Sequence, residues 1–248
     1  MSKYLIVANW KMNPKTLKEA QALFEAVKNG VKGAKEVEVV ICPPFVWLSK
    51  LNPGAKIKLG AQNCHWKNKG AYTGEVSTPM LTDLGVKYAL VGHSERRQFL
   101  GETDEIINLK IKAALRVKLR PILCVGEKEG EKIEQIVEGQ LVNALAGLNN
   151  SQLKEVIIVY EPVWAIGPGD PCLPDNVLSA NLFIRRVLTK LSSRFLADQT
   201  PILYGGSVEA ANAADYISKT RTNGLLVGGA SLDPEEFVKI IQSVNPHA

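Results

Sequence analysis

A carboxylate at the end of an apolar run is the residue of this sequence best placed to do chemistry. Glu161 follows the β-branched run of residues 156–160 and precedes Pro162. A residue before proline is held in an extended conformation, so Glu161 continues the strand direction and does not start a helix. Because a charge at the end of a buried strand costs free energy unless it is paired or used, we interpret Glu161 as a candidate general base. Residues 165–170 are interpreted as a cover over it.

Three further polar residues, His93, Lys11 and Asn9, follow apolar runs in the same way. His93 precedes a short helical turn, whose positive end disfavours the protonated ring, so a neutral imidazole would donate to a carbonyl oxygen. Lys11 would attract a phosphorylated substrate and stabilise a developing oxyanion, and Asn9 would hydrogen-bond the same oxygen. Each residue also has a simpler interpretation. His93 would fill a polar gap, Lys11 would be a solvated surface lysine, and Asn9 would cap nearby backbone groups.

Two pairs of glycines end the last two apolar runs. Gly205-Gly206 precedes Ser207, and Gly228-Gly229 precedes Ala230. Small residues that lead into a helix start let backbone N–H groups face an anion. A tight turn that needs glycine for a positive φ is the alternative for either pair alone. Two pairs after neighbouring strands favour a phosphate site.

Two nearby residues have less specific interpretations. Glu95 either pairs with Arg96 and Arg97 to anchor the short turn, or it orients Lys11. Cys124 ends an apolar run with no nearby base, so we expect it to be buried in the packing and not to act as a nucleophile.

Eight short apolar runs must position these side chains: residues 4–9, 37–41, 57–61, 88–91, 121–125, 156–160, 201–204 and 224–227. Most lack polar alternation, as expected for parallel strands that are covered on both faces. Helical patterns lie between them, for example at 17–27 and 103–117, and Asp233-Pro234 marks another helix start. Eight strand–helix units predict an α/β fold, a (β/α)8 barrel of eight parallel strands surrounded by helices, as one domain over residues 1–248.

An open doubly wound sheet is the competing fold, but no Gly-x-Gly-x-x-Gly follows the first strand. In a barrel the carboxyl ends of all strands meet at one mouth, which would bring the polar residues above together. The connections 62–77 and 162–173 are longer than usual, and such loops are typical of binding loops, lids or partner contacts.

Composition excludes several classes of function. The net charge of +5 is scattered, with no block of like charges, so we expect no nucleic-acid partner. The four cysteines show no zinc-type spacing, so we expect reduced thiols and no metal. The apolar N-terminal run is too short for a signal or membrane segment. We therefore expect a cytoplasmic protein without membrane attachment.

These residues lie in motifs that resemble those of the triosephosphate isomerase family along essentially the whole chain. The motifs are Asn9-Trp10-Lys11-Met12-Asn13, Thr73-Gly74-Glu75, Gly92-His93-Ser94-Glu95-Arg96-Arg97, Tyr160-Glu161-Pro162-Val163-Trp164-Ala165-Ile166-Gly167, Tyr204-Gly205-Gly206-Ser207-Val208 and Leu226-Val227-Gly228-Gly229-Ala230-Ser231. Several motifs in the right order are far more specific than any one of them.

The resemblance implies an isomerisation whose central step is the transfer of one proton between neighbouring carbon atoms. Glu161 would remove a proton next to the carbonyl of dihydroxyacetone phosphate and return it to the neighbouring carbon, giving glyceraldehyde 3-phosphate in glycolysis and gluconeogenesis. Neutral His93 and Lys11 would stabilise the enediolate, with no metal or organic cofactor. Backbone N–H groups near Gly167, Ser207, Gly228 and Gly229 would bind the phosphate. Closure of residues 162–172 would exclude water.

The resemblance also implies a homodimer. The loop at 62–77 would insert into a pocket of the partner, and Thr73 would approach the partner's Lys11 and His93. A long polar loop that carries Trp66 and Tyr72 agrees with an interface, whereas an exposed flexible loop is the alternative.

The sequence departs from the family pattern at two places. After Gly167 the family usually has Thr-Gly-Lys-Thr-Ala, whereas this chain has Pro-Gly-Asp-Pro-Cys at 168–172. The two additional prolines restrict the open loop, so we hypothesise that the Asp170-Pro171-Cys172 hinge changes lid kinetics and not the chemistry. Restoring Lys-Thr-Ala at 170–172 without any effect on turnover or ligand affinity would count against this. Asn223 stands where an aspartate that pairs with an arginine is common, which puts that ion pair in doubt.

Two alternative functions remain open at this point. A different phosphosugar barrel enzyme is disfavoured by the joint presence of Lys11, His93 and Glu161. A phosphate-binding barrel with a non-catalytic scaffold or sensor role stays possible because fold alone does not establish function.

Overall fold

The computed structural model describes residues 4–34, 36–167 and 171–244, and within them the chain forms a closed barrel of eight parallel strands. The strands are β1 (Tyr4–Asn9), β2 (Val37–Cys42), β3 (Ile57–Ala61), β4 (Tyr88–Val91), β5 (Arg120–Val125), β6 (Ile157–Tyr160), β7 (Ile202–Tyr204) and β8 (Gly224–Val227). Each strand pairs with the next, and β8 closes the barrel on β1 through the pairing of Leu225 with Ile6.

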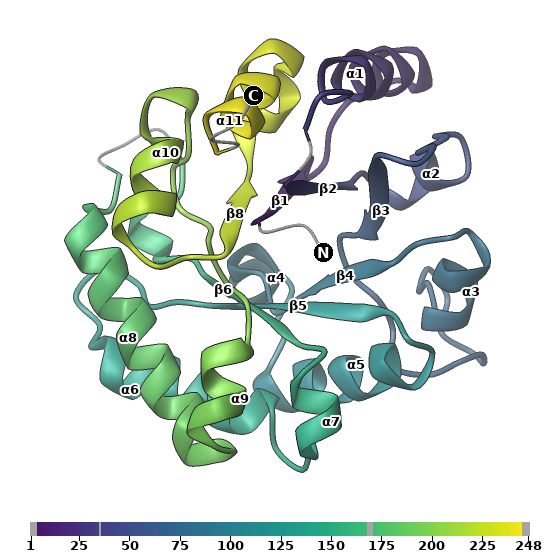
Figure 1. Cartoon of the computed structure of the whole chain (residues 1–248). Coiled ribbons are helices and arrows are strands. Elements are labelled where there is room, and N and C mark those ends of the chain that lie inside the picture. The colour runs from purple at the N-terminus through teal and green to yellow at the C-terminus, as the bar shows by residue number, and fades with distance from the viewer. Residues whose placement is uncertain (1–3, 35, 168–170, 245–248) are drawn as a thin grey trace.

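Helices surround the barrel (Figure 1). They are α1 (Leu17–Gly30), α2 (Phe45–Leu48), α3 (Thr78–Asp83), α4 (Ser94–Phe99), α5 (Asp104–Arg116), α6 (Ile133–Ala144), α7 (Asn150–Leu153), α8 (Pro174–Leu191), α9 (Arg194–Gln199), α10 (Ala210–Lys219) and α11 (Pro234–Val244), with 3₁₀ turns η1 (Val163–Ala165) and η2 (Gly229–Leu232). The predicted (β/α)8 barrel is confirmed. Among the described residues, no helix combines the length and apolar character needed to cross a bilayer.

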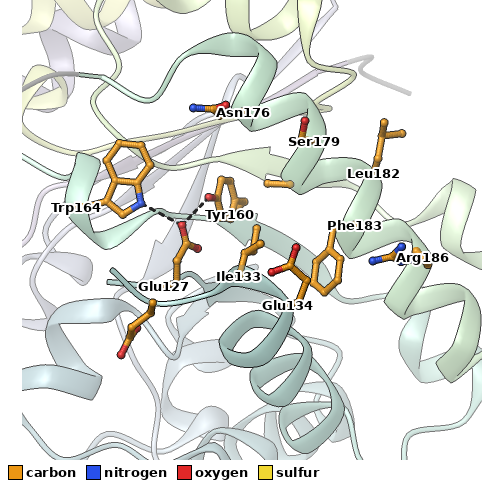
Figure 2. Close-up of a pocket in the computed structure, with 12 residues that line it drawn as sticks. Glu127, Ile133, Glu134, Tyr160, Trp164, Asn176, Ser179, Leu182, Phe183 and Arg186 are labelled. Carbon is orange, nitrogen blue, oxygen red and sulfur yellow. Dashed lines mark hydrogen bonds between the residues drawn. The ribbon is translucent and has the colours of Figure 1, made fainter. Parts of the chain in front are cut away.

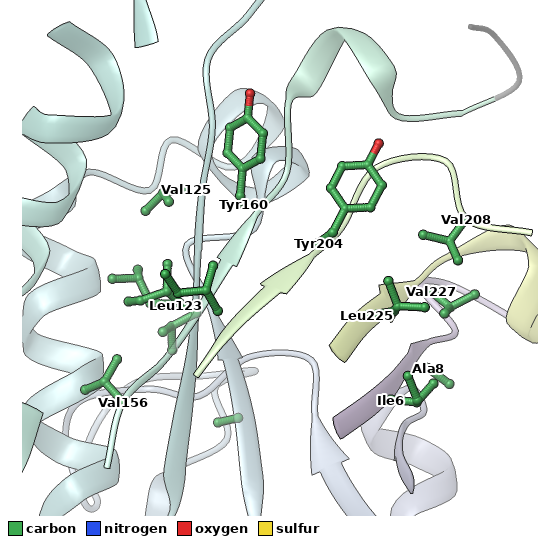
Figure 3. Packing of buried hydrophobic residues seen from close by; sticks show 14 of the residues in the cluster. Ile6, Ala8, Leu123, Val125, Val156, Tyr160, Tyr204, Val208, Leu225 and Val227 are labelled. Atoms are coloured by element: carbon green, nitrogen blue, oxygen red, sulfur yellow. The ribbon is translucent and has the colours of Figure 1, made fainter. Parts of the chain in front are cut away.

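Alternate side chains of most strands enter two different apolar clusters, which explains why these strands read as continuous apolar runs. In β1, Leu5 and Val7 belong to the cluster inside the barrel. Ile6 and Ala8 point outward into the larger cluster between barrel and helices, which Figure 3 shows with Leu225 and other outward residues. Both faces of a strand therefore need apolar residues.

The helix starts follow the capping signals in the sequence. Thr103 caps α5 by accepting the Ile106 N–H, as the pattern at 103–117 predicts. Asp233 Oδ1 accepts the N–H groups of Glu235 and Glu236 at 2.9 and 3.2 Å, so α11 begins with Pro234 as expected. Satisfying these first N–H groups fixes where each helix begins relative to its strand.

Strand limits differ from the prediction by a single residue in four strands. β2 is one residue longer at its end, β5 is one residue longer at its start, and β6 and β7 are each one residue shorter at their start. Val156 is excluded from β6 because its N–H donates to the Leu153 carbonyl and closes the turn after α7. None of these differences moves a polar residue away from the barrel mouth.

Candidate active site

The strand ends bring the predicted site residues to one mouth of the barrel. A cleft of about 350 Å³ lies there. It is lined by every predicted site residue except Glu161, namely Asn9, Lys11, His93, Gly167, Ser207, Gly228 and Gly229. Parallel strands place their carboxyl ends on the same side, so residues that are far apart in the sequence share this cleft.

Glu161 lies in the wall beside the cleft and is only 1% exposed. Its Oε1 accepts the Ser94 N–H at 2.6 Å. Its Oε2 lies 3.4 Å from His93 Nε2 and has no hydrogen-bond partner among the described residues. To reach a ligand in the cleft, the carboxylate has to turn away from Ser94.

Burial is the largest influence on the acidity of Glu161. Loss of solvation raises the pKa of the carboxyl above its ordinary value, while His93 and the Ser94 N–H oppose that rise. A carboxylate that is poorly solvated accepts a proton more readily, so its environment makes Glu161 a stronger base than a surface glutamate.

The ring of His93 is held by the start of a short helix. It occupies the N-cap position of α4, and its Nδ1 accepts the Glu95 N–H at 3.3 Å. A nitrogen that accepts a hydrogen bond carries no proton, so the neutral ring has its N–H at Nε2. The short helical turn predicted after His93 is confirmed, and Nε2 is the atom available for donation.

Lys11 is fixed at both its backbone and its ammonium group. Its φ of 51° lies in the left-handed region, and its N–H donates to Asn9 Oδ1 at 3.1 Å. The ammonium lies 2.7 Å from Glu95 Oε1. Of the two alternatives for Glu95, the structure shows the pairing with Lys11, and Asn9 has the capping role.

One contributor to this geometry, Gln62, was missed by the sequence analysis. Its side-chain amide donates to the carbonyls of Lys11 and Cys42, both at 2.8 Å. These bonds tie the segment after β1 to the end of β2 and support the strained backbone of Lys11. No local pattern marks Gln62, because its partners are far away in the sequence.

The glycine pairs differ in why they must be glycine. A Cβ on Gly206 would lie 2.2 Å from the Tyr204 hydroxyl, and one on Gly205 would lie 2.6 Å from Val159. Close approach therefore explains this first pair. A Cβ on Gly229 would meet open space, and one on Gly228 would approach only the Lys11 stem, at 3.5 Å. The second pair leaves the start of η2 open to the cleft, as a backbone anion site requires.

Ser207 takes part in a contact that the sequence does not reveal. Its N–H donates to the carbonyl of Ala165 at 2.9 Å. The N–H predicted to bind phosphate is thus already occupied in this state. It joins the segment after β7 to the first part of the loop that follows Glu161.

The start of that loop is anchored by Glu127, another residue that sequence reasoning did not place. Glu127 Oε1 accepts from the Tyr160 hydroxyl and from Trp164 Nε1, both at 3.0 Å (Figure 2). A cavity of about 710 Å³ opens beside these three residues and is lined by residues of α6 and α8. Through Glu127, these contacts hold Trp164 of η1 close to Tyr160 at the end of β6. The chain is therefore held on both sides of Glu161 and Pro162.

Only the last two residues of the unusual segment at 168–172 lie among the described residues. Pro168, Gly169 and Asp170 lie outside the described residues. Pro171 is exposed and Cys172 is buried. All four cysteines are free and buried, as expected, and burial raises the pKa of Cys124 well above its ordinary value, which disfavours a thiolate nucleophile.

The loop at 62–77 has an ordered base and an exposed tip. The His65 ring stacks on Trp66 and lies against Tyr72, with ring centroids 4.1 and 4.5 Å apart, and the His65 backbone N–H donates to the Val76 carbonyl. Thr73 is exposed. The aromatic cluster of His65, Trp66 and Tyr72 holds the base of the loop, and Thr73 lies at the exposed tip.

The fold and the cleft define a (β/α)8 barrel enzyme of the kind that places a base and an anion site at the carboxyl ends of its strands. The family model described as Triosephosphate isomerase matches residues 4–244. The chain belongs to the triosephosphate isomerase family.

Curated relatives extend the match over whole proteins. The chain is 47% identical over 246 residues to the triosephosphate isomerase of Aquifex aeolicus, covering 96% of this chain and 98% of that protein. It is 45% identical to that of Endomicrobium trichonymphae and 46% identical to that of Carboxydothermus hydrogenoformans, covering 98% of this chain and 99% of each relative. The match therefore includes the barrel and every loop at its mouth.

Proposed function

We propose that the chain interconverts dihydroxyacetone phosphate and D-glyceraldehyde 3-phosphate through an enediolate, as a triosephosphate isomerase. Family membership over nearly the whole chain supports the reaction. The observation that supports it best within the site is the buried Glu161 carboxylate, 3.4 Å from Nε2 of His93, whose Nδ1 accepts the Glu95 N–H, at the mouth that also holds Lys11. The relatives do not favour a non-catalytic scaffold or sensor.

In the forward direction, Glu161 turns from Ser94 and takes a proton from C1 of the ketone. The electron pair of the broken C–H bond forms the C1–C2 double bond, and the carbonyl oxygen becomes an oxyanion. His93 Nε2–H and the Lys11 ammonium stabilise that charge, as preorganised donors do in a site without bulk water. The hydroxyl proton on O1 then passes to O2, with His93 Nε2 as the group between the two oxygens. Glu161 returns its proton to C2, the electron pair of the C1–C2 double bond forms the new C2–H bond, an electron pair on O1 forms the aldehyde carbonyl, and the carboxylate is regenerated. No organic cofactor or metal takes part.

The phosphate is bound by backbone N–H groups of Gly167, Ser207, Gly228 and Gly229. The open start of η2 at Gly229 supports this assignment. Because the Ser207 N–H donates to the Ala165 carbonyl in this structure, closure of residues 162–172 has to break that bond before Ser207 reaches the phosphate. A ligand-driven exchange of this kind couples phosphate binding to exclusion of water.

The chain works as a homodimer of single-domain subunits, residues 1–248, in which the loop at 62–77 inserts into a pocket of the partner. Thr73 then approaches the partner's Lys11 and His93. Met12 is 92% exposed beside Lys11, and Phe99, the last residue of the helix that begins beside His93, is 70% exposed. Apolar side chains around a functional cleft are typical of a surface that a partner covers. Sedimentation of the wild-type chain and of Thr73→Glu tests this, with dissociation expected only for the variant.

The reaction is assigned to glycolysis and gluconeogenesis in the cytoplasm. A coupled assay with glyceraldehyde 3-phosphate tests it, beside a titration with a phosphate-bearing ligand. Turnover in the folded protein is the expected result. Binding of the ligand without any turnover would contradict the isomerase and favour the scaffold.

A further inference from the structure

A tyrosine of α10 holds the far end of the loop that follows Glu161. The Tyr216 hydroxyl donates to the Cys172 carbonyl at 2.8 Å. Tyr216 is 2% exposed and Cys172 is 1% exposed, so solvent hardly competes for this bond. The two residues come from different elements, since Tyr216 lies in α10 and Cys172 lies just before α8.

The ring of Tyr216 is itself firmly placed. It packs against the ring of Tyr204 at the end of β7, with centroids 4.2 Å apart and an interplanar angle of 34°. The Tyr216 carbonyl accepts the Thr222 hydroxyl at 2.9 Å, which fixes the end of α10 toward β8. The hydroxyl is therefore carried by a rigid support, and the bond to Cys172 constrains the loop more than it constrains the tyrosine.

The entry into α8 has little else to define it. The N-cap residue Leu173 offers no side-chain hydrogen bond, and the helix begins at Pro174, which has no N–H. The first part of the loop, in contrast, is anchored by Glu127 and by the Ser207–Ala165 bond. Tyr216 supplies the corresponding anchor at the other end.

We propose that Tyr216 is a positioning residue for the isomerisation: its hydroxyl fixes the Cys172 carbonyl and thereby the end of the connection between Glu161 and α8. This inference rests on the proposed function. With the end fixed, fewer loop conformations have to be given up on closure, so a ligand that requires closure binds more tightly. The hydroxyl, and not the ring, has this effect, because phenylalanine would preserve the packing on Tyr204.

A loosely held loop has a chemical consequence besides weaker binding. The enediolate can expel its phosphate when the C–O bond to the phosphate lies out of the plane of the double bond. The C1–C2 electron pair then forms a C2–C3 double bond, C1 becomes the aldehyde carbonyl, and the electron pair of the broken C3–O bond leaves with orthophosphate. The resulting enol takes up a proton at C3 and loses its hydroxyl proton to give methylglyoxal. A closed loop opposes this loss by holding the phosphate in place. Orthophosphate released per isomerisation therefore reports on loop positioning.

The test compares Tyr216→Phe with Tyr88→Phe. The control also removes a buried tyrosine hydroxyl that is hydrogen-bonded, to Glu38, but in β4 and away from the loop. The probe is 2-phosphoglycolate, whose carboxylate carries a charge like that of the enediolate. We expect its dissociation constant to rise about fivefold in Tyr216→Phe, the effect of one ordinary hydrogen bond, and to stay near the wild-type value in Tyr88→Phe.

Two further readouts distinguish loop positioning from general stability. Orthophosphate released per isomerisation should rise in Tyr216→Phe alone, and amide exchange of residues 171–176 should be faster in the unliganded variant. The proposal would be overturned if the two variants had the same dissociation constant for 2-phosphoglycolate, the same release of orthophosphate per isomerisation and the same amide exchange rate at 171–176. A wild-type chain that binds 2-phosphoglycolate without isomerising triose phosphate would instead contradict the proposed function, and the binding and exchange comparison would still decide the role of Tyr216.

Discussion

Glu161 and His93 face each other across 3.4 Å, with Oε2 of the carboxylate opposite Nε2 of the ring. Each is held from its other side by a backbone N–H of the same helix start, Ser94 for Glu161 Oε1 and Glu95 for His93 Nδ1. The first turn of α4 therefore sets both the position of the Glu161 carboxylate and the ring nitrogen of His93 that is left to donate. These are the two groups to which the proposed mechanism assigns the handling of protons.

His93→Gln tests whether the imidazole N–H stabilises the oxyanion. The amide of glutamine keeps a donor but cannot reproduce the ring geometry, so kcat should fall about 10²- to 10³-fold, as for other lost oxyanion donors, while KM changes little. A coupled assay measures both constants. An unchanged kcat in folded protein would remove His93 from the mechanism.

The pH dependence of the reaction follows from the raised pKa of Glu161. The base has to be ionised, so kcat/KM should be full at high pH and fall as the pH drops through a pKa above the ordinary carboxyl value of 4.5. A profile of kcat/KM between acid and neutral pH measures this. An apparent pKa in the acid limb of the profile at or below 4.5 would show that burial is not the dominant influence on the pKa of Glu161.

The same pKa shift predicts an effect on stability with the opposite sign to a salt-bridged carboxylate. The folded state binds the proton of Glu161 more tightly than the unfolded state, so its contribution to stability is present at low pH and is lost as the pH rises through the folded pKa. Glu161→Gln should therefore be at least as stable as wild type at neutral pH. Urea unfolding at several pH values checks this, and a marked loss of stability at neutral pH would be the contrary result.

Asn223→Asp should stabilise the protein. Asn223 Oδ1 accepts from the Ile202 N–H at 3.0 Å and from Arg185 Nη2 at 3.3 Å, so a hydrogen bond stands where the family commonly has an ion pair. A carboxylate would make both bonds charge-assisted, and we expect a gain of about 1 kcal/mol in the free energy of unfolding. The gain should vanish at low pH, as the new carboxyl is protonated. Equal stability of the two proteins at neutral pH would contradict this account.

Glu102→Gln should destabilise the fold. The Lys110 ammonium, 3% exposed, contacts the Glu102 carboxylate and lies 2.7 Å from Asn63 Oδ1. Removing the negative charge leaves a buried ammonium without its counter-charge, which costs about 3 kcal/mol or more in the free energy of unfolding. Urea denaturation measures the loss. In the double variant with Lys110→Met the loss should be smaller than in Glu102→Gln alone, and a loss as large in the double variant would show that the charge pair is not its cause.

The barrel could be predicted from the sequence because one pattern, a continuous apolar run followed by a helical pattern, recurs along the chain. Strands such as Tyr4–Asn9 are buried on both faces, so a continuous apolar run marked each of them, and caps such as Thr103 and Asp233 marked helix starts. The placement of the candidate site residues at one mouth could be predicted for a related reason. In parallel strands, the position just after the apolar run is enough to place a side chain at the mouth.

The contacts that the sequence did not predict all join distant segments. Gln62 holds Lys11 from 51 residues away, and Glu127 holds Trp164 from 37 residues away. Lys110 reads as one more charged residue of a helix, yet it is buried. Such contacts depend on how elements pack, and neither periodicity nor spacing records that packing.

The most direct measurement of the central claim is the turnover of Glu161→Gln with glyceraldehyde 3-phosphate. The substitution keeps the size of the side chain and removes the group that accepts the proton. The account predicts a folded protein that still binds 2-phosphoglycolate or inorganic phosphate and has lost turnover by about 10³-fold or more. Activity within a few-fold of wild type would show that Glu161 is not the base.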